Sequence, residues 1–390
     1  MKTQVAIIGA GPAGLLLAQM LKNADIECVV LEHRSRAYVL ERIRAGVLEP
    51  GTVDTLTEHG VADRLHREAI PHQQMMLRWD NRVHVLKDFH INGRRSVTYG
   101  QSEIVKDLIE RHELDGLTIH WETEVTAIDN LIDGPEVHFV NDGQANSVSA
   151  NFVAGCDGYR GVSRTTIPGV EDHCVVNEYP FAWLGILAQA PPKPTIRGYA
   201  HHVSGAAIGS ARSKDIGRLY LQVPRDTNID DWSDRRIWDE LDRRFEDGSG
   251  EQLNRGEILQ KDLALLRGFI CKKMQYGRLF LAGDAAHIVP PSGAKGLNLA
   301  VGDVRVMFEA IRRYLETGAT ELIENYSDIC LRRIYPMVHW ANRLCETLHV
   351  FPNQTSFQTR MQYETLRQWF YTENGQHEFI RSMLGAPYEY

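Results

Sequence analysis

Residues 4–21 read QVAIIGAGPAGLLLAQML, and this stretch decides the fold. The run from Gln4 to Ile8 is short and rich in β-branched residues, which is typical of a buried parallel strand. Three glycines follow at GxGxxG spacing, and the run from Leu15 to Leu21 consists of helix-favouring residues. A second strand-like run begins at Glu27 and ends on Glu32. This order and spacing predict a βαβ unit that binds a dinucleotide.

The three glycines have different expected roles in that unit. Gly9 permits the tight turn, Gly11 lets the backbone approach a pyrophosphate, and Gly14 lets the helix pack closely on the strand. The helix N-terminus then offers N–H groups and a partial positive charge to the phosphates. Glu32 is placed to accept hydrogen bonds from ribose hydroxyls. A glycine turn without a ligand is the alternative, but strand, helix and acid in register favour the dinucleotide site.

Composition limits the class of protein. The 390 residues, 43% of them hydrophobic and 24% charged, are enough for one large or two closely joined domains. The net charge of -8 argues against a general nucleic-acid or anionic-membrane binder. The six cysteines are scattered without a CxxC pair, so we expect reduced thiols, no metal site and a cytoplasmic enzyme. Val5 to Leu21 superficially resembles a signal-peptide core, but its glycines are explained by the nucleotide site.

Two later segments identify the dinucleotide. Residues 154–164 read AGCDGYRGVSR, and residues 278–298 include RLFLAGDAAH followed by PPSGAKGLN. These segments resemble the DG and GD motifs of flavoprotein monooxygenases, which carry FAD in a single nucleotide fold. The resemblance implies that Asp157 and Asp284 serve the FAD site, with Asp284 at the ribityl chain. It also places the backbone near Leu297 and Asn298 against the flavin ring.

The resemblance narrows to the para-hydroxybenzoate hydroxylases among the FAD-dependent aromatic hydroxylases, and it covers Met1 to Tyr390 nearly without gaps. In that family NADPH or NADH binds transiently, without a Rossmann domain of its own, and only one complete glycine fingerprint is present here. NADPH is favoured because Arg34 is suited to a 2′-phosphate, although a solvated basic helix start explains Arg34 equally well. The cofactor residues that the resemblance implies are Arg42, Arg44 and Gln101 for FAD, and His33, Arg34, Tyr38, Arg160 and Arg267 for the nicotinamide cofactor.

A second region carries the candidate substrate residues. The alternating run from Arg218 to Pro224 predicts a strand with Arg218, Tyr220 and Gln222 on one face. The guanidinium of Arg212 is suited to bidentate pairing with a carboxylate. From the pattern alone a solvated sheet face is the alternative; the resemblance favours a pocket for a small aromatic carboxylate. It implies substrate contacts from Tyr199, Ser210, Arg212 and Tyr220, a proton relay from Tyr199 to His72, shielding of the flavin by Pro291, and control of flavin reduction by Arg218.

The implied reaction is hydroxylation of 4-hydroxybenzoate ortho to its phenolate, giving 3,4-dihydroxybenzoate, with NAD(P)H and O2 consumed through a flavin hydroperoxide. Three positions depart from the family: its second relay tyrosine falls on Met383, Arg197 replaces a leucine near the substrate ring, and Ser292 replaces a threonine. Met383 and Arg197 leave ring-modified substrates open. These are 4-hydroxyisophthalate with loss of CO2, 3,4-dihydroxybenzoate and 4-aminobenzoate.

Other classes of flavoprotein make different demands on the sequence. A flavin-dependent halogenase carries a WxWxIP segment, which does not occur in this sequence. A non-oxygenating flavin reductase or oxidase would not need the substrate set, and a non-catalytic FAD-binding regulator would not oxidise NADPH. We therefore expect a doubly wound α/β FAD domain with an inserted, mostly antiparallel substrate sheet. The resemblance to the family also implies a homodimer. The predicted FAD domain comprises residues 1–71, 97–178 and 266–345; the substrate domain comprises 72–96 and 179–265, and a helical segment covers 346–390.

Overall fold

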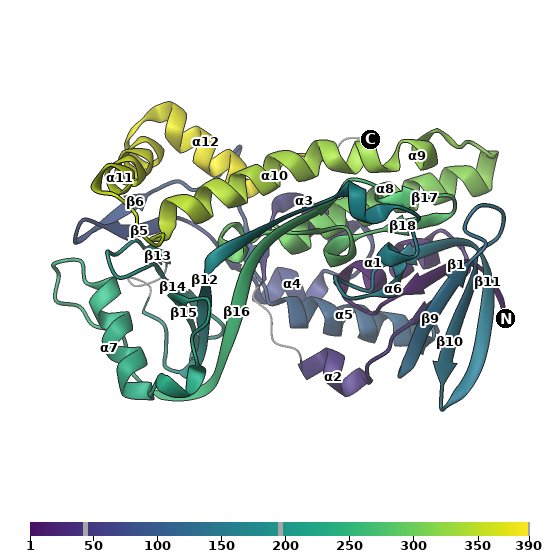
Figure 1. The fold of residues 1–390 in the computed structure, drawn as a ribbon, viewed down its shortest axis with the longest axis horizontal. Helices are drawn as coiled ribbons and strands as arrows, with labels where there is room; N and C mark the ends of the chain where they lie inside the picture. Colours follow the sequence, from purple (N-terminus) through teal and green to yellow (C-terminus); the bar gives the residue numbers. More distant parts are fainter. Residues whose placement is uncertain (42–45, 194–197, 389–390) are drawn as a thin grey trace.

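The protein is described by a computed structural model that covers residues 1–41, 46–193 and 198–388. Its first large sheet contains the nucleotide-binding unit (Figure 1). The strand order is β17 (Gln275–Tyr276), β18 (Leu279–Leu281), β11 (Gln144–Gly155), β1 (Lys2–Ile8), β2 (Cys28–Leu31) and β8 (Ile119–His120), with β10 (Glu136–Asn141) and β9 (Thr123–Asp129) continuing from β11. The strands from β18 to β8 are parallel, as predicted for a doubly wound fold.

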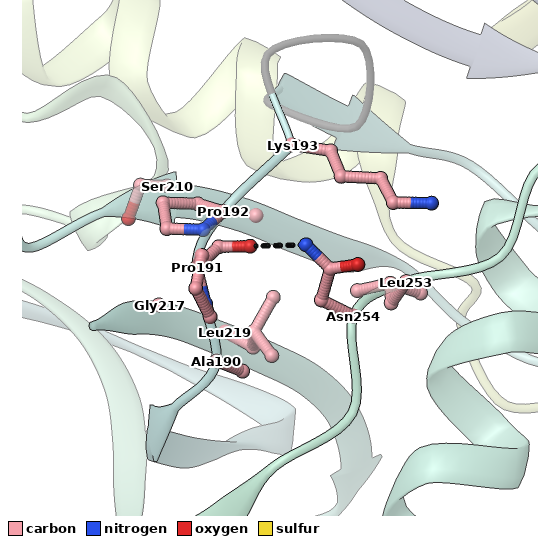
Figure 2. Close-up of a pocket in the computed structure, with 10 residues that line it drawn as sticks. Ala190, Pro191, Pro192, Lys193, Ser210, Gly217, Leu219, Leu253 and Asn254 are labelled. Carbon is pink, nitrogen blue, oxygen red and sulfur yellow. Dashed lines mark hydrogen bonds between the residues drawn. The ribbon is translucent and has the colours of Figure 1, made fainter. Parts of the chain in front are cut away.

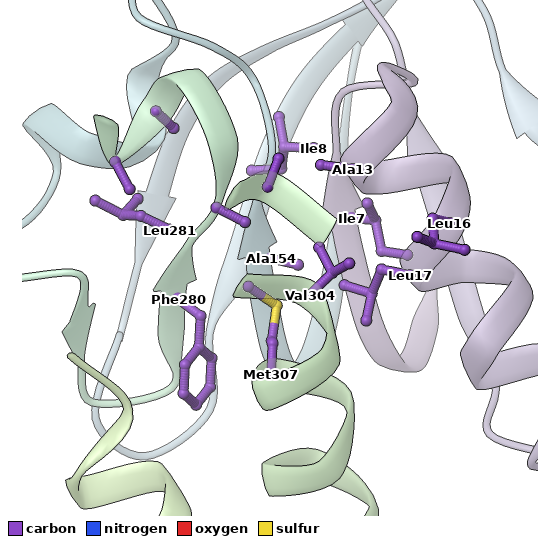
Figure 3. Packing of buried hydrophobic residues seen from close by; sticks show 14 of the residues in the cluster. Ile7, Ile8, Ala13, Leu16, Leu17, Ala154, Phe280, Leu281, Val304 and Met307 are labelled. Atoms are coloured by element: carbon purple, nitrogen blue, oxygen red, sulfur yellow. The ribbon is translucent and has the colours of Figure 1, made fainter. Parts of the chain in front are cut away.

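The core of this sheet forms between its central strands and the helices that cover them. Helix α1 (Pro12–Asn23) begins with Pro12 at the first helical turn, where the missing N–H is not needed. It packs against α8 (Gly296–Thr317) and α5 (Gln101–Leu114). Figure 3 shows Ile7, Leu17, Val304 and other apolar side chains of this core gathered between α1, α8 and the strands. A Cβ on Gly283 would lie 3.3 Å from Ala300 Cβ on α8 and 3.8 Å from Ala13 Cβ on α1, so the first turns of the two helices lie close together.

The second large sheet is antiparallel except where β13 pairs with β5. Its order is β19 (His287–Ile288), β16 (Glu257–Cys271), β12 (Cys174–Gln189), β15 (Gly217–Pro224), β14 (Ala207–Ala211), β13 (Gly198–Ala200), β5 (Met75–Trp79) and β6 (Arg82–Leu86). Helix α7 (Asp234–Phe245) covers one face, where Trp238 and Leu241 pack on Leu219 and Leu221. The other face is therefore left for the candidate substrate residues.

Helices complete the fold at the C-terminal end of the chain. Helix α10 (Tyr326–Leu348) spans both sheets, and α11 (Ser356–Tyr371) and α12 (Glu373–Leu384) lie beside the second sheet (Figure 1). A capping box between Thr355 and Gln358 fixes the start of α11. The remaining elements are short: α2 (Arg36–Glu41), α3 (Pro50–Glu58), α4 (Asp63–Glu68), α6 (Val162–Thr165), α9 (Glu321–Glu324), and a small sheet of β3 (Val47–Leu48), β7 (Val97–Thr98) and β4 (Ile70–Pro71).

Strands β12 and β16 form one long ribbon between the two halves of the molecule (Figure 1). The predicted domain boundaries at 178/179 and 265/266 fall inside these two strands. The α/β fold class with an inserted antiparallel sheet and C-terminal helices is confirmed, whereas the division into domains stays a prediction. Within residues 1–41, 46–193 and 198–388, no helix combines the length and apolar character needed to cross a bilayer.

Candidate active site

The glycine loop has the geometry of a phosphate cradle. Gly9 has a φ of +104°, and a Cβ there would lie 2.5 Å from the carbonyl oxygen of Cys156. A Cβ on Gly14 would lie 2.1 Å from the carbonyl oxygen of Gly9. Around Gly11, by contrast, a Cβ would meet no atom of the described chain within 4 Å. Two glycines therefore close the turn, and the third keeps a space open at the N-terminus of α1 that fits a pyrophosphate.

Glu32 is buried beside this loop and holds it in place. Its Oε2 accepts a hydrogen bond from Ala10 N at 2.7 Å, and its Oε1 accepts one from Arg34 N at 2.8 Å. His33 Nδ1 lies 2.9 Å from the same Oε1. A carboxylate can accept further hydrogen bonds through its remaining lone pairs. The predicted contact with ribose hydroxyls therefore fits the geometry and stays a prediction.

Asp284 is presented to solvent by a short turn that α8 holds rigid. Asp303 on α8 accepts a hydrogen bond from Gly283 N at 3.0 Å and lies 2.6 Å from Nε2 of His287. Burial alone would lower the pKa of His287, but Asp303 raises it above its usual value. An exposed carboxylate on a fixed turn suits the predicted ribityl contact.

Asp157 has a different environment from Asp284. Its Oδ2 accepts hydrogen bonds from the backbone N and the Oγ of Ser163, at 2.9 and 2.8 Å. Burial raises the pKa of this carboxyl group. The side chain therefore stabilises its own turn, and its predicted role in binding FAD stays a prediction.

The predicted flavin loop precedes α8, with Pro291 exposed and Leu297 half-buried. The side chain of Asn298 is engaged by the protein. Its Oδ1 accepts from Glu49 N and Thr52 Oγ1, and its Nδ2 donates to the carbonyl oxygens of Val47 and Ala294. Since these four bonds use both donors and both lone pairs, the backbone of Asn298 is the part left for the flavin ring.

A buried charge network beneath this loop was not predicted. Lys295 Nζ donates to Glu49 Oε1 at 2.7 Å and to the carbonyl oxygen of Met383 at 2.9 Å. Arg333 Nη2 lies 2.7 Å from Glu49 Oε2. Burial lowers the pKa of Lys295, and Glu49 opposes that shift. The network joins the flavin loop to the C-terminal segment. A lysine inside a glycine-rich loop was the only sequence signal for it.

The residues assigned to the nicotinamide cofactor lie in two places. The guanidinium of Arg34 lies 4.9 Å from the ring centroid of Tyr38, close to Glu32. Arg267 covers the ring of Tyr159 at 4.5 Å, and Arg160 is exposed next to it in the chain. Arg42, Arg44 and Arg197 lie outside the described residues, and Gln101 is the first residue of α5. The nicotinamide site stays a prediction.

The candidate substrate residues lie on the face of the second sheet opposite α7. Tyr199 pairs with Ile208, which in turn pairs with Tyr220, so these three side chains point to the same side. Ser210 pairs with Arg218 two residues further along and has the same orientation. The structure thus brings together residues that are spread over the chain, and the predicted shared face of Arg218 and Tyr220 is confirmed.

Arg212 extends from this sheet to the nucleotide-binding half. Its Nη2 donates to Ser102 Oγ at 2.8 Å and lies 3.3 Å from Glu103 Oε1, both at the start of α5. A Cβ on Gly100 would lie 2.0 Å from Arg212 Nη1, so a glycine is needed for this approach. Glu103 also pairs with Arg64 at 2.5 Å. The guanidinium is therefore held at the boundary between the two sheets.

The hydroxyl groups of the candidate site have protein partners in this structure. Ser210 Oγ donates to the carbonyl oxygen of Arg218 at 3.2 Å, and Arg218 Nε donates to the hydroxyl of Tyr220. Tyr199 donates to the carbonyl oxygen of Ser292 at 2.6 Å, and burial raises the pKa of Tyr199. This bond directs the Tyr199 hydroxyl toward the predicted flavin loop.

His72 and Met383 occupy different surroundings. His72 is half-buried, with Nε2 2.6 Å from Thr98 Oγ1 and Nδ1 3.3 Å from Ser96 Oγ. Met383 is 5% exposed, in an apolar cluster against which Tyr199 packs. The position of the family's second relay tyrosine therefore belongs to the apolar cluster on which Tyr199 packs. The relay to His72 stays a prediction.

A buried histidine supports this face of the sheet. The rings of Trp183 and Tyr220 pack at a tilt, with centroids 4.9 Å apart, and Trp183 Nε1 donates to His349 Nε2 at 2.7 Å. His349 Nδ1 lies 2.7 Å from the carbonyl oxygen of Cys345, so the neutral ring with its proton on Nδ1 satisfies both contacts. Burial lowers the pKa of His349 from 6.5 to about 4.

This shift predicts acid sensitivity. Between pH 6.5 and 4, His349 is protonated in the unfolded chain but neutral in the folded protein. The free energy of unfolding therefore falls as pH falls through that window. The loss amounts to about 3 kcal/mol when complete. Urea unfolding from pH 7 to 4.5 measures it. His349→Gln is expected to reduce the pH dependence, leaving the contribution of His112, whose pKa burial also lowers to about 4. An unchanged slope in that variant would contradict the assignment.

A cavity at the edge of the second sheet is distinct from the candidate substrate face (Figure 2). Leu219, which belongs to the face under α7, projects into it, and Asn254 closes one side by donating to the carbonyl oxygen of Pro191 at 2.8 Å. Ser210 borders both regions. The lining residues are Ala190, Pro191, Pro192, Lys193, Gly209, Ser210, Gly217, Leu219, Leu253 and Asn254.

Comparison with known proteins identifies the class. The FAD binding domain family matches residues 2–341. p-Hydroxybenzoate hydroxylase from Acinetobacter baylyi is 39% identical over 390 residues, covering 100% of this chain and 96% of that protein. The solved structure of p-nitrophenol 4-monooxygenase from Pseudomonas putida DLL-E4 superposes with a TM-score of 0.81 at 18% identity and covers 99% of both chains. A flavin-dependent halogenase superposes with a TM-score of 0.73 at 17% identity, covering 95% of this chain and 72% of that one.

The glycine loop and the family match thus define an FAD-binding protein, and a halogenase shares its fold. The 39% sequence identity to p-hydroxybenzoate hydroxylase over the full chain narrows this class to one family. The chain belongs to the FAD-dependent aromatic hydroxylase family that includes p-hydroxybenzoate hydroxylase.

Proposed function

We propose that this enzyme hydroxylates 4-hydroxybenzoate ortho to its phenolate and releases 3,4-dihydroxybenzoate, consuming NADPH and O2. The observation that carries the proposal is the single sheet face that presents Tyr199, Ser210, Arg218 and Tyr220, with Arg212 at its end. The Acinetobacter relative supports the same substrate. The predicted cytoplasmic location, NADPH preference and homodimer belong to this proposal.

The residues have separate tasks in the proposed reaction. Arg212 binds the substrate carboxylate through charge-assisted hydrogen bonds, and Ser210 and Tyr220 add hydroxyl contacts. Tyr199 stays protonated because burial raises its pKa, and when substrate binds its hydroxyl turns from the carbonyl oxygen of Ser292 to donate a hydrogen bond to the phenolate. FAD, when bound, accepts reducing equivalents from NADPH and activates O2. Pro291 and the flavin loop exclude water from the reacting atoms.

Product analysis tests the proposal. NADPH and NADH consumption is measured with 4-hydroxybenzoate, 4-hydroxyisophthalate, 3,4-dihydroxybenzoate and 4-aminobenzoate. We expect 4-hydroxybenzoate to give 3,4-dihydroxybenzoate in nearly one-to-one ratio with NADPH. If 4-hydroxybenzoate yields mainly hydrogen peroxide while one of the modified rings is oxygenated, that modified ring is the substrate and the proposal is wrong. The burial of Met383 in the apolar cluster on which Tyr199 packs is the observation that favours this second candidate.

Met383→Tyr is expected to introduce a proton-transfer group into the apolar cluster on which Tyr199 packs. The bound 4-hydroxybenzoate should then ionise more readily, and its hydroxylation rate at pH 6.5 should rise roughly tenfold. Ultraviolet difference spectra of bound substrate and single-turnover rates measure both effects. Met361→Tyr on α11 is the matched control, because Met361 is exposed and lies on a different helix from Met383. Equal behaviour of the two variants would show that Met383 has no part in substrate ionisation.

A further inference from the structure

Cys174 and Cys271 face each other across the ribbon of β12 and β16. The two residues are direct partners in the antiparallel register. Lys272 N donates to the carbonyl oxygen of His173 at 2.8 Å, and this pattern marks the Cys174–Cys271 pair as non-hydrogen-bonded. The Cα atoms of such pairs lie about 4.5 Å apart, which falls within the range that disulfides span. A bond between the sulfurs therefore requires little backbone movement.

The two thiols differ in access and in electrostatic environment. Cys174 is half-buried, whereas Cys271 is fully buried. Burial raises the pKa of both thiols, to about 12 for Cys271. The Cys271 thiol donates to the carbonyl oxygen of Lys273 at 3.2 Å. The neighbouring Cys271 and Arg164 oppose the rise in the pKa of Cys174. Cys174 is thus the sulfur that an oxidant reaches first and that ionises more readily.

The pair lies next to the turn that presents Asp284. Cys271 N donates to the carbonyl oxygen of Ala286 at 2.7 Å, and the preceding residue, Ile270, pairs with His287. The ribbon also carries the substrate sheet, because the whole segment between Cys174 and Cys271 contributes β13, β14 and β15. A covalent link at this point would fix the ribbon where it meets the cofactor-binding half.

We propose that Cys174 and Cys271 form an oxidation site, which hydrogen peroxide converts into a cross-strand disulfide. Cys174 attacks one oxygen of the peroxide, forming a sulfenic acid and releasing one water. Cys271 then attacks that sulfur, the S–S bond forms, and a second water leaves. Two thiols lose two electrons and two protons, and the peroxide is reduced to two waters. The site is independent of the identity of the aromatic substrate.

Peptide mass spectrometry of the full-length holoenzyme tests the site. Reduced enzyme is treated with hydrogen peroxide, and free thiols are then alkylated. We expect a peptide linked through Cys174 and Cys271, reversed by dithiothreitol, and a rise of about 5 °C in the unfolding midpoint of the oxidised enzyme. Cys28→Ser should leave the link intact. In Cys271→Ser the peroxide should stop at a sulfenic acid on Cys174, trapped by dimedone, with no rise in midpoint.

Two outcomes would overturn the proposal. One is oxidation of Cys174 to sulfinic acid in the wild type while Cys271 remains alkylatable. The other is a disulfide that involves a different cysteine and persists in Cys174→Ser. Because dimedone trapping reports on Cys174 within the folded Cys271→Ser enzyme, loss of the link in that variant is distinguished from misfolding.

Discussion

Gly11→Ala is expected to raise the dissociation constant for FAD at least 100-fold while leaving the FAD-free protein almost as stable as the wild type. The backbone at Gly11 has φ -74° and ψ 176°, a conformation that alanine adopts without strain. A Cβ there meets no described atom of the protein within 4 Å, so the added methyl group projects into the space reserved for the pyrophosphate. A 100-fold loss corresponds to about 2.8 kcal/mol.

Gly14→Ala is the matched comparison for this prediction. Its Cβ would lie 2.1 Å from the carbonyl oxygen of Gly9, so the substitution must separate α1 from β1. We expect it to lower the stability of the FAD-free protein itself, by several kcal/mol. FAD titration by fluorescence quenching and urea unfolding separate the two effects. Wild-type FAD affinity in Gly11→Ala would show that the pyrophosphate does not approach this turn.

The nucleotide-binding unit was predictable because its determinants are local. All of its parts lie within one short segment: the strand before Gly9, the helix after Pro12 and the acid Glu32. The combination of these residue types at this spacing is rarely found outside dinucleotide-binding units. The structure places β1, α1 and β2 where the pattern predicts them. The period-two alternation around Tyr220 likewise predicted which side chains share a face.

Long-range contacts were not predictable in the same way. Lys295 and Glu49 are 246 positions apart, and nothing in either neighbourhood indicates that the two charges meet. The approach of Arg212 to the start of α5 depends on how the sheets dock, which no local pattern encodes. Such contacts follow from tertiary packing, and the relay from Tyr199 to His72 remains a prediction for the same reason.

Arg212→Gln is expected to weaken binding of 4-hydroxybenzoate by about 100-fold or more, because the substitution removes a bidentate, charge-assisted pair with the substrate carboxylate. The fold should tolerate it, since Glu103 keeps its ion pair with Arg64. Arg212→Lys should recover only part of the affinity, because an ammonium group cannot pair through two parallel hydrogen bonds. Equilibrium binding followed by flavin absorbance measures each constant.

Arg225→Gln provides a control with the same change of charge. Arg225 follows β15 directly and pairs with Glu178 at 3.0 Å, on the same sheet but outside the candidate set. Phenol, which lacks the carboxylate, gives a second control: its weaker binding should be the same in wild type and Arg212→Gln. Two results would contradict the prediction: Arg212→Gln weakens the binding of phenol and of 4-hydroxybenzoate equally, or Arg225→Gln weakens 4-hydroxybenzoate binding as much as Arg212→Gln does. In either case Arg212 supports the shape of the pocket, and the carboxylate has another partner. The proposed orientation of the ring, with its phenolate toward Tyr199, would then no longer be supported, because it depends on the carboxylate binding to Arg212.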